Sequence, residues 1–346
     1  MQFLKYFKWT LLLTIASLIV AYFYGGWAAL LTCIVLGILE ISLSFDNAVL
    51  NASILRKMSP FWQKMFLTIG IVIAVFGMRL VFPLLIVGIA AQLNPVEALQ
   101  LALAKGDPHT PGTYGYILAE AHPYIAAFGG MFLLLLFFDF IFADRDIKWL
   151  QRIEAPLAKI GQLKTISVLI ALGALLAGTA ALPEHTRLTA LTAGVFGVML
   201  YILIKGLGDL FQQYSEKKMG NLTLAVGKAG FFMFLYLEVL DATLSFDGAI
   251  GAFAITPDPI IIALGLGVIG AMAVRSLTVF MVRKGTLDEF VHLEHGAHWA
   301  IGALAIILLV SITVHVNEII TGLIGLVFIG TAFWTSILYR RKHSVK

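Results

Sequence analysis

The chain alternates long apolar runs with short polar segments. A run of about 20 apolar residues is long enough to cross the hydrocarbon core of a bilayer as a helix. Ten runs predict membrane-spanning helices at residues 9–24, 27–50, 62–87, 122–142, 166–182, 188–206, 229–252, 259–281, 298–315 and 319–338. The sequence therefore predicts an all-α, polytopic membrane protein of about ten transmembrane helices, forming a single transmembrane domain over residues 1–346.

Composition agrees with a membrane protein. The chain is 60% apolar and only 13% charged, whereas a soluble protein needs more charge to cover its water-facing surface. The single cysteine, Cys33, excludes internal disulfides and cysteine-rich metal sites.

The basic residues predict how the chain crosses the membrane. With the N-terminus in the cytoplasm, 20 of the 24 Lys and Arg residues fall in cytoplasmic segments, and only Lys105 and Arg187 fall outside. Cytoplasmic loops are enriched in Lys and Arg, so we expect both termini in the cytoplasm and the protein in a bacterial inner membrane. Because these charges flank the membrane, the formal charge of +4 does not indicate a nucleic-acid partner.

One acidic motif occurs twice. Residues 40–48 read EISLSFDNA and residues 241–249 read DATLSFDGA, so each position of the second copy follows its counterpart by 201 residues. A charge near the bilayer centre costs about 2.5–3.5 kcal/mol on insertion scales. Acids that are repeated inside apolar runs therefore predict a functional site, of which the two copies are halves.

The two copies are expected to cross the membrane in opposite directions. They lie on the second and seventh predicted spans, which are an odd number of spans apart. Two intramembrane arginines, Arg79 and Arg275, repeat this relation on the third and eighth spans. The sequence therefore predicts two inverted five-helix repeats, residues 1–182 and 183–346, an architecture known in transporters that bind their substrate at the repeat interface.

The side chains of the motifs favour a hard divalent cation. They offer carboxylate, amide and hydroxyl oxygens, which suit Mn²⁺, Mg²⁺ or Ca²⁺. The expected metal ligands are Glu40, Ser44, Asp46, Asn47, Asn51, Glu238, Asp241, Ser245 and Asp247. The second Asp of each copy lies about 120° around a regular helix from the first acid. Either the helices unwind near residues 45–46 and 246–247, freeing carbonyl oxygens, or these aspartates serve another neighbour.

Charge balance suggests supporting groups and proton coupling. Five acids near two arginines leave a negative excess that a divalent cation and protons would balance, because buried carboxylates take up protons readily. We expect Arg79 and Arg275 to steady the empty carboxylates and Glu238 to act as a ligand or proton carrier. Asp139 is either a gate or an interfacial residue. No prosthetic group is expected, and the oligomeric state stays open.

The motifs also carry a family resemblance. Glu40 with Ser44-Phe45-Asp46-Asn47, and Glu238-x-x-Asp241-x-x-x-Ser245-x-Asp247, resemble the signatures of TerC-type integral membrane proteins, within the lysine-exporter-like superfamily. Residues 27–90 and 225–340 carry this resemblance. It implies export of Mn²⁺ and a link to tellurium resistance. Gly248 stands where the family usually has Ser.

Three other functions fit parts of the sequence. An intramembrane aspartyl protease would need facing aspartates such as Asp46 and Asp247, and residues 206–209 read Gly-Leu-Gly-Asp, but no Tyr-Asp partner lies on a neighbouring span. A metal-handover or tellurite-resistance accessory protein would use the same ligands without transport. An exporter of a small organic solute could use the arginines, although the acids outnumber them. The sequence therefore predicts a transporter rather than an enzyme.

Two polar segments remain. The outer loop, residues 88–121, contains turn signals and predicts a short surface helix. His292, His295 and His298 are spaced by three, so one helical face could hold a metal site; the alternative is a solvated interfacial helix.

Overall fold

The computed structural model describes an all-helical chain. It describes residues 2–43, 45–70, 72–73, 76–77, 81–104, 106–107, 109–163, 165–219, 224–256, 258–284, 290–314, 316 and 318–343. These residues form helices and connecting turns and no named strand. They group into two compact units. Unit 1 comprises Met1–Ala48, Lys64–His122 and Asp241–Phe280, and unit 2 comprises Val49–Gln63, Pro123–Leu240 and Met281–Lys346.

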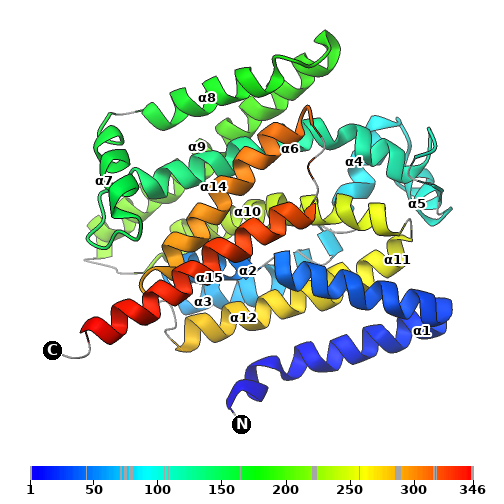
Figure 1. Cartoon of the computed structure of the whole chain (residues 1–346), viewed down its shortest axis with the longest axis horizontal. Helices are drawn as coiled ribbons and strands as arrows, with labels where there is room; N and C mark the ends of the chain where they lie inside the picture. Colours follow the sequence, from blue (N-terminus) through cyan, green and yellow to red (C-terminus); the bar gives the residue numbers. More distant parts are fainter. Residues whose placement is uncertain are drawn as a thin grey trace. The chain divides into compact units, whose positions relative to one another are not determined.

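Unit 1 begins with a helical hairpin. Helix α1 (Gln2–Leu43) is interrupted by non-helical backbone at Gly25 and Gly26, and its ribbon turns back on itself there (Figure 1). Gly26 has a φ of +67° and a ψ of −154°, a conformation that is open to glycine and strained for other residues. The break confirms the boundary expected between residues 24 and 27.

The second arm of this hairpin packs closely on a glycine-rich π-helical segment. This segment, η3 (Ala263–Gly270), lies between α11 (Pro259–Ile262) and α12 (Ala271–Lys284). A Cβ on Gly265 would lie 2.8 Å from both the Cys33 carbonyl oxygen and the Leu36 Cβ. Small residues allow membrane helices to approach this closely, and here they hold α1 against the second half of the sequence.

Hydroxyl groups and one arginine fasten α12 within unit 1. The first arm of α1 contributes Thr10, whose Oγ1 lies 2.8 Å from the Met272 carbonyl oxygen and 2.7 Å from the Ser276 hydroxyl. Arg275 Nε donates to the carbonyl oxygen of Leu67 at 3.0 Å. Leu67 belongs to a second π-helical segment, η1 (Phe66–Gly70), which follows α3 (Pro60–Met65).

The segment 88–121 contains the short helix expected there. After α4 (Phe82–Ala90), helix α5 spans Pro95–Leu103. Asn94 Oδ1 accepts hydrogen bonds from the backbone of Val96 and Glu97, and Glu97 Oε2 accepts one from the backbone of Asn94. This capping box, followed by proline at the first helical position, fixes where α5 begins.

Unit 2 contains most of the long helices. Its members are the larger part of α6 (Tyr114–Ile141), then α7 (Gln151–Ile160), α8 (Ile166–Thr179), α9 (Glu184–Met219), the first half of α10 (Gly227–Ile255), α14 (Leu293–Ser311) and α15 (Glu318–His343). Five described helices contribute residues to both units: α2 (Phe45–Leu55), α3, α6, α10 and α12. The α6 segment 131–137 is buried throughout and forms the apolar centre of unit 2.

The chain is an all-helical, multi-pass membrane protein by helix length and composition. Six described helices are long and apolar enough to cross a bilayer: Tyr6–Ile38, Tyr114–Ile141, Thr186–Leu207, Pro259–Lys284, Leu293–Ser311 and Leu323–Lys342. The expected span at 166–182 gives α8, whose 14 residues rise only about 21 Å against a hydrocarbon core of about 30 Å. Residues 62–87 are described only in part, so the count of ten spans stays a prediction.

Candidate cation site

The two acidic motifs meet through one hydrogen bond in unit 1. Asn47, on α2, donates from Nδ2 to Oδ1 of Asp241, on α10, at 2.7 Å. The side chains are 2% and 6% exposed, and 194 residues separate them in sequence. Asn47 comes from the first copy and Asp241 from the second, so this contact joins the copies.

A third motif residue is buried in the same unit. Glu40, near the end of α1, is 1% exposed. Its side chain lies directly against Gly270 at the end of η3, where any Cβ would overlap with the Glu40 side chain. The Cβ and Cγ of Glu40 therefore occupy space that only a glycine leaves open.

The second motif lies inside the regular helix α10, whereas the first lies where α1 ends at Leu43 and α2 begins at Phe45, with Ser44 outside the described residues. Phe45 and Asp46 are helical residues of α2, and Phe246 and Asp247 are helical residues of α10. The unwinding predicted near residues 246–247 is therefore wrong, whereas the unwinding predicted near residues 45–46 stays a prediction. Helix α10 keeps the backbone of Phe246 and Asp247 helical, which leaves for Asp247 the alternative that it serves another neighbour, while both alternatives stay open for Asp46.

Several predicted ligands lie outside what the structure describes. Ser44 and Arg79 are outside the described residues, as are the side chains of Asp46, Ser245 and Asp247. Asn51 and Glu238 are described in unit 2, where they are 2% and 7% exposed. Among the described side chains, no three His, Cys, Asp or Glu residues gather as a metal site. The full ligand set therefore stays a prediction.

The structure describes partners for Arg275 and Asp139, two residues that were expected to support the cation site. Arg275 directs Nε to the Leu67 carbonyl, so its predicted pairing with the motif carboxylates stays a prediction. Asp139, on α6, forms an ion pair with Lys205 and accepts a hydrogen bond from the Tyr201 hydroxyl, both on α9. Asp139 thus joins two helices of unit 2.

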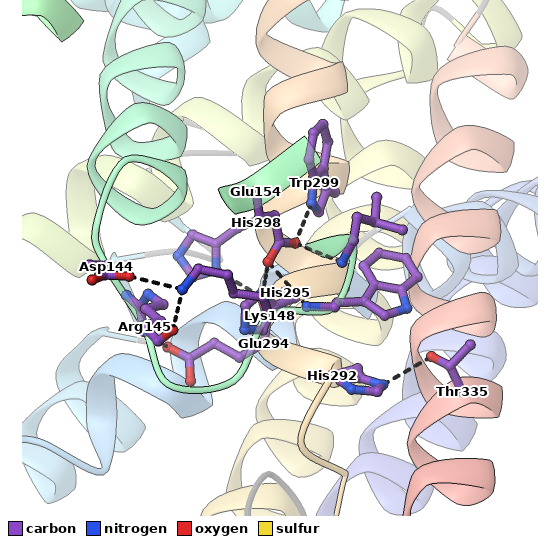
Figure 2. A network of polar contacts seen from close by, with 12 residues as sticks. Asp144, Arg145, Lys148, Glu154, His292, Glu294, His295, His298, Trp299 and Thr335 are labelled. Atoms are coloured by element: carbon purple, nitrogen blue, oxygen red, sulfur yellow. Dashed lines mark hydrogen bonds and ion pairs between the residues drawn. The ribbon is translucent and has the colours of Figure 1, made fainter. Parts of the chain in front are cut away.

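The three histidines are buried structural residues rather than exposed ones. His292, His295 and His298 are 8%, 5% and 7% exposed, so the expectation of a solvated helix is wrong. They also point to separate partners (Figure 2). His292 Nδ1 lies 3.2 Å from Thr335 Oγ1, and His298 Nδ1 lies 2.8 Å from the Glu294 carbonyl oxygen. The metal-site alternative has no convergent ligands among these described groups.

The partner of His295 is a glutamate that sequence reasoning missed. Glu154, on α7, is 3% exposed; its Oε2 lies 3.0 Å from His295 Nδ1, and its Oε1 accepts a hydrogen bond of 3.0 Å from Trp299 Nε1. Burial alone would raise the pKa of Glu154, but the close contact with His295 and the hydrogen bonds from Trp299 and the Leu150 backbone together outweigh it and lower the pKa. The pair fastens α7 to α14 (Figure 2). A single glutamate in a mixed-charge segment gave no sequence signal for this role.

Comparisons with known proteins place the chain in one family. A family model described as "Protein of unknown function (DUF475)" matches residues 45–343. The match includes Asp46, Asn47 and the whole second motif, and it begins five residues after Glu40. No curated protein and no solved structure matches the chain.

Proposed function

The chain belongs to the DUF475 family of proteins of unknown function, and from its own site we propose that it is a membrane transporter that exports a divalent cation, with Mn²⁺ as the first candidate. The observation that carries this proposal is the buried contact between Asn47 and Asp241. It brings together one residue from each copy of the repeated acidic motif.

Burial of the motif carboxylates favours the binding of a cation. An ionised carboxylate removed from water loses several kcal/mol of solvation, which a bound cation or proton restores. Asn47 supplies a neutral amide donor to Asp241, and this contact does not neutralise the carboxylate's negative charge. Glu40, also buried, adds a second carboxylate in the same unit. Oxygen ligands of this kind bind Mn²⁺, Mg²⁺ and Ca²⁺ in preference to soft metals.

The full proposal adds features taken from the sequence. Ten spans form two inverted halves, with both termini in the cytoplasm of a bacterial inner membrane. Asp46 and Asp247 complete the ligand set, with hydroxyl oxygens from Ser44 and Ser245. Protons replace the metal on return, and one half rocks against the other to alternate access. The resemblance to TerC-type proteins supports Mn²⁺ as the substrate.

Transport by the purified protein tests the proposal. Sealed proteoliposomes would be loaded with Mn²⁺, Mg²⁺, Ca²⁺, Fe²⁺ or Zn²⁺ in turn, with and without a pH gradient, and release would be followed against protein-free vesicles. We expect release of Mn²⁺ faster than in the empty vesicles and dependent on the pH gradient. A metal-handover factor would bind Mn²⁺ without releasing it across the bilayer, and that result would overturn the proposal.

A further inference from the structure

Unit 2 contains a cavity that the cation site does not use. Its volume is about 310 Å³, which is about ten times the volume that one water molecule occupies in the liquid and lies at the small end of ligand pockets. Residues from α2, α6, α9, α10 and α14 line it, together with the segments after α2 and α6.

One group of residues in the cavity wall has an excess of positive charge. The group consists of Lys57, Arg145 and a single carboxylate, Glu294. That carboxylate is already shared, because it lies 3.0 Å from Arg56 and 4.0 Å from Arg145. Three cations therefore lie around Glu294, and Glu154 also interacts electrostatically with one of them, Arg145.

Within the described part of the chain, Arg145 Nε and the Lys57 side chain each lack an anionic partner. Arg145 Nε is buried there and has no hydrogen-bond acceptor. Lys57 forms no ion pair with a described residue; burial lowers its pKa, Glu294 raises it, and Arg145 and Arg56 lower it further. An anion placed between Lys57 and Arg145 would satisfy both groups.

The fold holds the backbone of Lys57 and the guanidinium of Arg145 in place. The Lys57 carbonyl oxygen accepts a hydrogen bond of 2.8 Å from the backbone of Ala225. The Arg145 guanidinium stacks 3.8 Å above the centroid of the Phe140 ring. A planar guanidinium held in this way presents a prearranged fork to a carboxylate or phosphate group.

A second group of lining residues has the opposite character. The group consists of Asp139, Asp209 and one cation, Lys205, which forms an ion pair with Asp139 and interacts electrostatically with Asp209. The carboxylates of Asp139 and Asp209 would repel an anionic group. Apolar and aromatic side chains, among them Leu136 and Phe232, line the rest of the wall.

From these observations we propose that the cavity binds a small molecule or lipid headgroup bearing one carboxylate or phosphate group, held between Lys57 and Arg145 with its remaining part against the apolar wall. The oxyanion accepts from the free Nε–H of Arg145 and from the Lys57 ammonium. Glu294 limits the affinity because it competes with the ligand for Arg145. This site is independent of the proposed transport of a cation.

Thermal unfolding of the purified full chain in a neutral detergent tests the site. Sodium phosphate and sodium benzoate would be titrated at an ionic strength kept constant with NaCl. We expect a saturable rise in the unfolding temperature, since a ligand that binds only the folded state stabilises it. Lys57→Gln and Arg145→Gln should each weaken the apparent affinity about tenfold, the effect of losing about 1.4 kcal/mol of binding free energy.

Two further variants separate binding from misfolding. Arg152→Gln removes an exposed cation of α7 that does not line the cavity, and it should bind like the wild type. Glu294→Gln removes the competing carboxylate and should tighten binding several-fold, a gain that partial unfolding cannot produce. Weaker binding by Glu294→Gln, or equal binding by Arg145→Gln and the wild type, would overturn the proposal.

A lipid arm identifies the source of the anion. The protein would be placed in nanodiscs of phosphatidylcholine alone or of phosphatidylcholine with phosphatidylglycerol. Stabilisation by phosphatidylglycerol that Arg145→Gln abolishes would identify a lipid headgroup, whereas stabilisation by phosphate or benzoate in detergent would identify a soluble ligand. Absence of stabilisation by all three probes would overturn the proposal.

Discussion

The amide of Asn47 donates to the carboxylate of Asp241 at 2.7 Å, across 194 residues of sequence. Both side chains are buried. The contact links α2 to α10 inside one compact unit, so residues from the two copies of the acidic motif share one environment. This is the relationship that a shared cation site requires.

Removal of the Asn47 amide should weaken the fold. Asn47→Ala leaves the buried Asp241 carboxylate without this donor, and we expect a loss of about 1–2 kcal/mol in the free energy of unfolding. Reversible unfolding in detergent would measure it. In a double-mutant cycle with Asp241→Ala, the two losses should be non-additive by about 1 kcal/mol; strictly additive losses would show that the bond contributes nothing.

The space beside Glu40 should be essential for transport. Gly270→Ala places a methyl group where the Glu40 side chain lies, so the carboxylate must move, and we expect Mn²⁺ release from proteoliposomes to fall about tenfold or more. A displacement of about 1 Å from productive geometry can have an effect of this size.

Gly173 provides the matched control for this substitution. It is an exposed helical glycine of α8, and a Cβ added there would have no neighbouring atom within 4 Å. Gly173→Ala should transport normally and gain up to about 1 kcal/mol of helix stability. Wild-type transport by Gly270→Ala would count against a role for Glu40.

The placement of helices was largely predictable, because it depends on local signals. The Gly25-Gly26 pair marks the turn of α1, and Asn94, Pro95 and Glu97 mark the start of α5. The repeated motif also pointed to residues that the structure brings together, since acids in apolar runs need one another or a cation.

The remaining features depend on contacts between distant segments. Gly270 reads as an ordinary membrane glycine until Glu40 is seen against it. The burial of His295 depends on Glu154, which lies 141 residues earlier on a separate amphipathic helix. Helical periodicity placed the three histidines on one face, but it carried no information about which neighbour would cover that face.

The pair formed by Glu154 and His295 should make stability depend on pH. The lowered pKa of Glu154 means that its contribution is present above its ordinary value of 4.5 and is lost as the pH falls through the lower value of the folded state. Glu154→Gln should therefore cost about 1–3 kcal/mol near pH 7, and the difference from the wild type should shrink below about pH 4.5.

Unfolding temperatures of the two proteins between pH 3.5 and 8 would measure this dependence. Asp144→Asn is the control, because Asp144 is an exposed acid that pairs with Lys148 and exposed ion pairs contribute about 0–1 kcal/mol. A difference between Glu154→Gln and the wild type that is constant down to the lowest pH would contradict the account.

The stoichiometry of Mn²⁺ binding to the purified chain tests most directly whether two motifs form one site. Equilibrium dialysis with metal analysis would compare the wild type with Asp46→Asn and Asp247→Asn, each confirmed to be inserted and folded. The account predicts one Mn²⁺ per wild-type chain and a loss of binding in either variant alone. Two ions per chain, or binding by each variant at half the wild-type stoichiometry, would show two separate sites and contradict it.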